Sequence, residues 1–257
     1  VAFLVVGTIF VWYASERRIY ANWPQVTMPT LAVTPAQLIG LMGGVTLAAI
    51  FGFIDDKWQI RARWQLIEQL LLAGVALAGG ILITTIYNPF ALFGGSPTIE
   101  LGDDVGMLLT LLWIVGMINS INFIDGLDGL STGVSLIAAI TIGVISLYTS
   151  VWTVEPMVGL LCAVLAGALA GFLPWNFHPA KVFIGTTGVY AVGFALAVLS
   201  ILTAAKVAVA LLILGVPIID TFWIIVRRLS QKKSPFTPDR GHIHHRLLDL
   251  GLSHRNA

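Results

Sequence analysis

Long apolar segments recur along this chain, and they restrict its possible folds more than any other feature. Breaks that contain proline, glycine or asparagine separate these segments, as in NWPQVTMPT at 22–30. A segment that crosses a bilayer must satisfy its own backbone hydrogen bonds, so runs of this length are predicted to be transmembrane helices. We expect helices near 1–14, 35–54, 65–86, 105–121, 132–150, 157–174, 188–204 and 206–227.

The composition agrees with a membrane protein. Hydrophobic residues make up 57% of the 257 residues and charged residues only 11%, whereas a soluble domain carries about 25% charged residues. The sequence therefore predicts an all-α, polytopic transmembrane bundle of about eight helices, forming a single domain over residues 1–257. The segment 1–14 is shorter than the ~20 residues that span a bilayer, so we expect a chain truncated at both ends. The net charge of +1 gives no indication of nucleic-acid binding, and a single cysteine, Cys162, excludes a disulfide framework.

The distribution of basic residues predicts the orientation. If the segments alternate across the membrane, the connections at 55–64, 122–131, 175–187 and 228–257 lie on one side. All but three of the 14 Lys and Arg residues fall in or beside this set, the exceptions being Arg17, Arg18 and Lys206. The positive-inside rule places this set in the cytoplasm. Four polar loops could therefore build one cytoplasmic site.

The first polar cluster, FGFIDDKWQIRARWQL, contains two adjacent carboxylates where a helix is predicted to end. A solvated helix end, with Asp55 and Asp56 paired to nearby Lys and Arg, is the simpler interpretation. Carboxylates at a helix C-terminus oppose the helix dipole, however, and adjacent like charges disfavour each other. Such a pair suits proton abstraction or the handling of a metal–phosphate complex.

The second cluster, INSINFIDGLDGLSTG at 118–133, interrupts an apolar region with amides, carboxylates and glycines. Asn119 and Asn122 are three residues apart and share a helix face, and Asp125 and Asp128 continue this spacing into a glycine-containing turn. Oxygen ligands of this kind suit Mg²⁺ or Mn²⁺. The alternative is a glycine-rich helix junction in which an aspartate caps the next helix.

The third cluster, WNFHPAKVFIGTTGVYAVGF at 175–194, places Gly185 and Gly188 around two threonines before an apolar helix. The start of this helix could receive a phosphate, or Thr186 or Thr187 could be an ordinary N-cap.

The fourth cluster, SPFTPDRGHIHHRLLDLG, combines three histidines with two arginines. Its spacing matches no usual zinc motif, and recognition of a diphosphate is favoured over a basic juxtamembrane patch.

In order and spacing these four motifs resemble those of the polyprenyl-phosphate N-acetylhexosamine-1-phosphate transferases. The resemblance covers nearly the whole chain, and the HIHH loop is more similar to the WecA/TagO branch than to the muropeptide branch. It implies attack of a polyprenyl phosphate, such as undecaprenyl phosphate, on a UDP-amino sugar, with UDP-N-acetylglucosamine as the typical donor. The products would be a polyprenyl-diphospho-sugar and UMP, in the first membrane step of cell-envelope polysaccharide synthesis.

The resemblance also implies roles for individual residues. Asp55 and Asp56 would be catalytic and serve the lipid phosphate, one of them as the candidate base. The implied substrate-binding residues are Asn119, Asp125, Asp128, Asn176, Arg240, His242, His244 and His245, and the implied metal ligands are Asn122 and Asp125. The implied cofactor is Mg²⁺, with Mn²⁺ as an alternative. The implied partners are polyprenyl phosphate, a UDP-amino sugar and the bilayer of a bacterial inner membrane, with no nucleic acid and with a homodimer left open.

One departure from the family pattern bears on activity. The family reads Gly-Asp-Thr/Ser/Ala-Gly-Ser at the third motif, and its Asp is a principal Mg²⁺ ligand. This chain has Thr186 at the Asp position and Val189 at the Ser position. The leading hypothesis is therefore a transferase, and the second is a degenerate member that binds lipid phosphate or nucleotide sugar without turnover. A transporter ranks last, because its charges should lie near the midplane of broken helices.

Overall fold

The computed structural model describes residues 33–88, 98–148 and 156–203, apart from a few isolated positions outside these ranges. Six helices and two short strands form within this part of the chain. They are α2 (Pro35–Trp58), α3 (Ala62–Ala78), β1 (Thr85–Tyr87), β2 (Thr98–Glu100), α4 (Asp103–Ile124), α5 (Leu130–Tyr148), α6 (Pro156–Asn176) and α7 (Gly185–Leu202).

Five of these helices are long and apolar enough to cross a membrane, namely α2, α4, α5, α6 and α7. The prediction of an all-α, polytopic membrane bundle is confirmed. The expected helices at 1–14 and 206–227 lie outside the described residues, so the eight-helix count and the single domain over 1–257 stay predictions.

The expected helix at 65–86 is the one that the structure corrects. Helix α3 already ends at Ala78, followed by Gly79 and by Gly80 with a φ of 75°. Gly79 packs closely on α2, where an added Cβ would lie 3.0 Å from the Gly40 Cα. Beyond it the apolar residues are extended, and strand β1 pairs antiparallel with β2. Hydropathy alone could not separate the helix from the extended segment after it, which is rich in β-branched residues, because both are apolar.

Helix α7 lies at the centre of the bundle, packed against α2, α4, α5 and α6. Its contact with α2 is antiparallel and depends on small residues. A Cβ at Gly44 would lie 2.2 Å from the Phe194 ring, and one at Gly52 would lie 2.4 Å from the Thr186 carbonyl oxygen. Such glycines let two helix backbones approach closely in a membrane protein.

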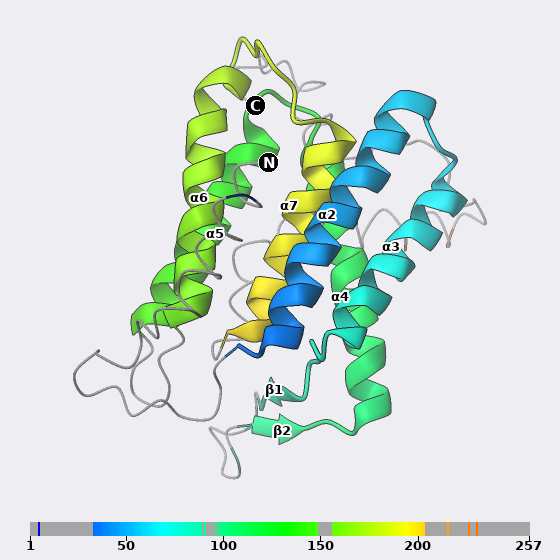
Figure 1. Cartoon of the computed structure of the whole chain (residues 1–257), viewed down its shortest axis with the longest axis vertical. Helices are drawn as coiled ribbons and strands as arrows, with labels where there is room; N and C mark the ends of the chain where they lie inside the picture. Colours follow the sequence, from blue (N-terminus) through cyan, green and yellow to red (C-terminus); the bar gives the residue numbers. More distant parts are fainter. Residues whose placement is uncertain are drawn as a thin grey trace.

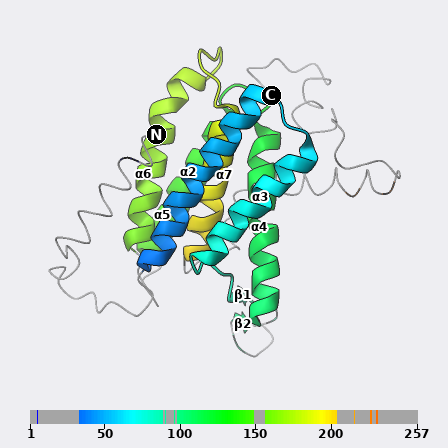
Figure 2. The ribbon, with the colours of Figure 1, turned by 45° about the vertical axis from the view of Figure 1, so that its right-hand side comes forward.

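Three helix connections gather at one end of the bundle (Figure 1). These are 59–61 between α2 and α3, 125–129 between α4 and α5, and 177–184 between α6 and α7. The β1–β2 hairpin lies at the opposite end, and the view turned by 45° shows the same arrangement (Figure 2). The described parts of the first three polar clusters therefore meet at one end, as the alternation of spans predicts.

Candidate functional site

The adjacent carboxylates Asp55 and Asp56 face different partners. Asp55 is buried near the end of α2, and its Oδ1 accepts hydrogen bonds from the Ile60 backbone N–H at 2.9 Å and from Gln65 Nε2 at 2.8 Å. Asp56 is exposed and faces α7. Asp55 therefore fixes the turn between α2 and α3, while Asp56 joins α2 to α7.

Asp56 caps the first turn of α7. Its Oδ1 accepts a hydrogen bond from the Thr186 N–H at 2.8 Å, and its Oδ2 accepts from the Thr187 N–H at 2.9 Å and the Thr187 hydroxyl at 2.6 Å. Gly185 has a φ of 64°, and a Cβ there would lie 2.9 Å from Asp56 Oδ2. The sequence left open whether this helix start receives a phosphate or is capped by its own threonines. In the structure a carboxylate from α2 caps it. This is favourable because free N–H groups and the positive end of the helix dipole meet there.

Asp125 follows directly after α4, which ends at Ile124. Its carboxylate accepts a hydrogen bond from the Ser131 hydroxyl at the start of α5. Burial raises the pKa of the Asp125 carboxyl, the Ser131 hydrogen bond acts in the opposite direction, and the negative charge of Asp56 raises the pKa further. Asp56 and Asp125, from two separate motifs, therefore lie close enough to repel each other.

The pair Asp56 and Asp125 is the candidate for a cation site in the described part of the chain. In the described part of the chain neither carboxylate forms an ion pair with Lys or Arg, and the Asn122 side chain makes no hydrogen bond. No cluster of three or more acidic, His or Cys residues that could hold a metal occurs among the described residues. Mg²⁺ usually keeps several waters and binds one or two carboxylates together with substrate phosphates. Asp56, Asp125 and Asn122 fit a Mg²⁺ ion of that kind, shared with a phosphorylated substrate.

Asn119, a predicted substrate-binding residue on α4, lies in a partly buried network. Its Nδ2 donates to Gln69 Oε1 at 2.5 Å and to the Val115 carbonyl at 2.8 Å. Gln69 Nε2 in turn donates to Asn119 Oδ1 at 3.3 Å and to the Tyr190 hydroxyl oxygen at 3.2 Å. These contacts join α3, α4 and α7, so Asn119 contributes to helix packing.

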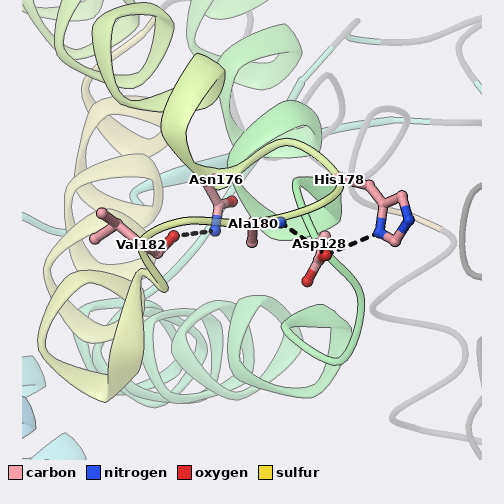
Figure 3. A network of polar contacts seen from close by, with 5 residues as sticks. All are labelled: Asp128, Asn176, His178, Ala180 and Val182. Atoms are coloured by element: carbon pink, nitrogen blue, oxygen red, sulfur yellow. Dashed lines mark hydrogen bonds and ion pairs between the residues drawn. The ribbon is translucent and has the colours of Figure 1, made fainter.

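Asp128 and Asn176 hold the loop between α6 and α7 (Figure 3). Asp128 Oδ2 lies 2.9 Å from His178 Nδ1 and accepts from the Ala180 N–H at 3.1 Å. Asn176 is only 3% exposed, and its Nδ2 donates to the Val182 carbonyl at 3.1 Å. Asp128, from the second motif, is therefore hydrogen-bonded to His178 and Ala180 of the third motif, and Asn176 is hydrogen-bonded within the third motif.

The predicted binding residues Arg240, His242, His244 and His245 lie outside the described residues. Among the residues that sequence reasoning missed, Gln65 and Gln69 follow each other at a spacing of four on α3, a spacing that predicts a shared helix face. His178 has no comparable signal, because its partner Asp128 is 50 residues away.

Comparisons with known proteins find similar sequences. The glycosyl transferase family 4 model matches residues 38–204. A probable undecaprenyl-phosphate N-acetylglucosaminyl 1-phosphate transferase of Bacillus subtilis is 38% identical over 228 residues, covering 86% of this chain and 61% of the relative. A decaprenyl-phosphate N-acetylglucosaminephosphotransferase of Mycolicibacterium smegmatis is 35% identical, covering 97% of this chain and 65% of the relative. A phospho-N-acetylmuramoyl-pentapeptide-transferase of Carboxydothermus hydrogenoformans is 32% identical over 79% of this chain. The chain spans less than two thirds of the length of these curated relatives.

Proposed function

Because the chain belongs to glycosyl transferase family 4, we propose that it transfers a sugar 1-phosphate from a UDP-amino sugar to a polyprenyl phosphate. The proposed donor is UDP-N-acetylglucosamine and the proposed acceptor is undecaprenyl phosphate, in line with the names of similar proteins. The proposed setting is the cytoplasmic face of a bacterial inner membrane, at the first membrane step of cell-envelope polysaccharide synthesis.

One observation carries this proposal. Asp56 and Asp125 come from motifs about 70 residues apart, yet the ends of α2 and α4 that carry them lie at the same end of the bundle. Burial of Asp125 and, to a smaller extent, the charge of Asp56 raise the pKa of Asp125. The two like charges have no described basic partner. A site of this kind at one end of a membrane bundle suits a substrate that arrives as a metal–diphosphate complex beside a lipid phosphate.

The proposed reaction requires positioning more than covalent chemistry by the protein. An oxygen of the lipid phosphate forms a bond to the β-phosphorus of the donor, and the bond from that phosphorus to the UMP oxygen breaks. A phosphate monoester has a second pKa of about 6, so the attacking group is already largely ionised at neutral pH. Asp56, which accepts three hydrogen bonds from α7, is therefore assigned to holding the site, and the need for a base is small.

Mg²⁺ remains a proposal, with Mn²⁺ as the alternative. When bound, it would neutralise charge on the donor diphosphate. Asn122 and Asp125 are the proposed ligands, and Asp56 contributes negative charge. The loop with Arg240, His242, His244 and His245 is proposed, by family resemblance, to close over the diphosphate and sugar.

A second candidate is a degenerate member that binds without turnover. The observation in its favour is Thr186, which contributes its backbone N–H to the Asp56 cap and has a neutral hydroxyl where the family has a carboxylate. A hydroxyl is a much weaker ligand for Mg²⁺ than a carboxylate.

The test is UMP release by membranes that contain the full-length protein. UDP-N-acetylglucosamine, undecaprenyl phosphate and Mg²⁺ are supplied together, and reactions lacking the lipid or the metal are the controls. We expect UMP only in the complete reaction. Absence of UMP from the natural protein, together with its appearance in Thr186→Asp, would refute turnover and support the degenerate member.

A further inference from the structure

We propose that Gln69 is a positioning residue that holds α4 against α7 about one turn from the candidate site, and so fixes the relative position of the groups in that site. The proposal rests on the proposed function, because Asn122 lies in the last turn of α4, Asp125 follows that turn, and Asp56 is hydrogen-bonded to α7. Gln69 itself is 2% exposed and lies on α3.

The first step of the argument is the pairing of two amides. Gln69 and Asn119 exchange hydrogen bonds at 2.5 and 3.3 Å, so each side chain acts as both donor and acceptor. The second N–H of Asn119 is used by the Val115 carbonyl. An amide pair with its hydrogen bonds satisfied in a buried site is strongly oriented, because any rotation leaves polar atoms without partners.

The second step is the link to α7. Gln69 Nε2 also donates to the hydroxyl oxygen of Tyr190, a fully buried residue three positions after Thr187. Asn119 likewise lies three positions before Asn122. Since residues three apart share a helix face, Gln69 contacts both helices about one turn below the candidate site.

Polar contacts also join α3 to α2 and α2 to α7. One turn before Gln69, Gln65 donates to Asp55 at 2.8 Å, which ties α3 to the end of α2. The next residue, Asp56, caps α7 through Thr186 and Thr187. Helices α2, α3, α4 and α7 are thus joined at the end that holds Asp56 and Asp125. A change at Gln69 alters the relative position of these groups without touching either of them.

A matched control exists on the same two helices. Trp113 Nε1 on α4 donates to the Ser200 hydroxyl on α7 at 3.0 Å. Ser200 is ten residues beyond Tyr190, or about 15 Å along the helix and away from the site. Ser200→Ala therefore removes one α4–α7 hydrogen bond that has no bearing on the position of Asn122 or Asp125.

The experiment compares Gln69→Leu, Tyr190→Phe and Ser200→Ala in the full-length protein. The rate of UMP release is measured against Mg²⁺ concentration, and thermal unfolding is measured in the same detergent. We expect Gln69→Leu to lower kcat by about tenfold or more and to raise the Mg²⁺ concentration for half-maximal rate. Tyr190→Phe should shift the Mg²⁺ requirement in the same direction by a smaller factor. Ser200→Ala should lower the unfolding temperature but leave the Mg²⁺ dependence unchanged.

Equal Mg²⁺ dependence in all three variants would overturn the proposal and leave Gln69 as a packing residue. A second readout needs no activity, namely hydrogen exchange of the Thr186 and Thr187 amides without metal or substrate. The proposal is supported if these amides exchange faster in Gln69→Leu but at the rate of the natural protein in Ser200→Ala. Exchange at the rate of the natural protein in both variants refutes it. If the natural protein releases no UMP, the proposed function fails, and this exchange comparison still decides the role of Gln69.

Discussion

The close approach of α2 and α7 at Gly52 makes a quantitative prediction possible. In Gly52→Ala the new Cβ would lie 2.4 Å from the Thr186 carbonyl oxygen and 2.5 Å from the Thr187 Cα, whereas ordinary contacts begin at 3.4 Å. Both clashing atoms belong to the backbone of α7, so the clash can be removed only if the two helices separate by about 1 Å. The hydrogen bonds from Thr186 and Thr187 to Asp56, now 2.6–2.9 Å long, would then exceed the usual range.

The energetic terms can be compared. Overpacking of this kind costs about 1–3 kcal/mol. Weakening the exposed hydrogen bonds to Asp56 costs about 1 kcal/mol more, and the better helix propensity of alanine returns about 1 kcal/mol. We therefore expect the free energy of unfolding to fall by about 1–3 kcal/mol, with a larger proportional loss of UMP release because Asp56 moves relative to Asp125.

Gly43→Ala is the control for this experiment. Gly43 lies on the same helix, and an added Cβ there meets nothing within 4 Å. Denaturant unfolding in mixed micelles gives the stability, and UMP release per folded protein gives the activity. If Gly52→Ala behaves like Gly43→Ala in both measurements, the packing argument and the capping role of Asp56 are both wrong.

Two further substitutions test separate parts of the structure. Asp56→Asn should abolish UMP release while the protein stays folded, because an amide oxygen can replace only part of the carboxylate that α7 contacts; an unchanged rate would remove Asp56 from the mechanism. Thr110→Val should lower the free energy of unfolding by about 1–3 kcal/mol, since the fully buried Thr110 hydroxyl accepts from the Ile83 N–H at 2.9 Å and a valine leaves that donor unpaired. Thr46→Val, which removes only an exposed hydrogen bond within its own helix, is the control, and equal unfolding midpoints for the two variants would contradict this account.

Hydropathy predicted most of the bundle because burial in lipid and burial in protein both require apolar residues. The prediction for α4, 105–121, lies within the observed Asp103–Ile124, and that for α6, 157–174, lies within Pro156–Asn176. It was wrong for the second half of 65–86, where an apolar segment leaves the helix at a pair of glycines. Gly80 adopts a left-handed conformation that most other residues would strain to reach.

The sequence predicted where the described candidate residues lie in the bundle, but not which groups they contact. Motif spacing brought Asp56, Asn122 and Asp125 to one end of the bundle, because antiparallel helices return their alternate connections to the same side. The partners of these groups depend on how helices far apart in sequence pack against each other. The capping of α7 by Asp56 across 130 residues and the contact of Gln69 with Tyr190 across 121 residues have no local signal.

The threonine at position 186 bears on both the stability of the α7 start and the proposed metal binding. The family pattern has an aspartate there, which would place a third negative charge beside Asp56 and Asp125, and like charges at such distances disfavour one another. With Thr186, the first turn of α7 is neutral apart from its dipole, and Asp56 can cap it with both carboxylate oxygens. A threonine at this position favours the start of α7, whereas an aspartate would be the stronger ligand for the proposed Mg²⁺ ion, and such a balance between stability and activity is common at active sites. Thr186→Asp should therefore tighten Mg²⁺ binding and weaken the cap together, so its effect on unfolding should depend on whether Mg²⁺ is present.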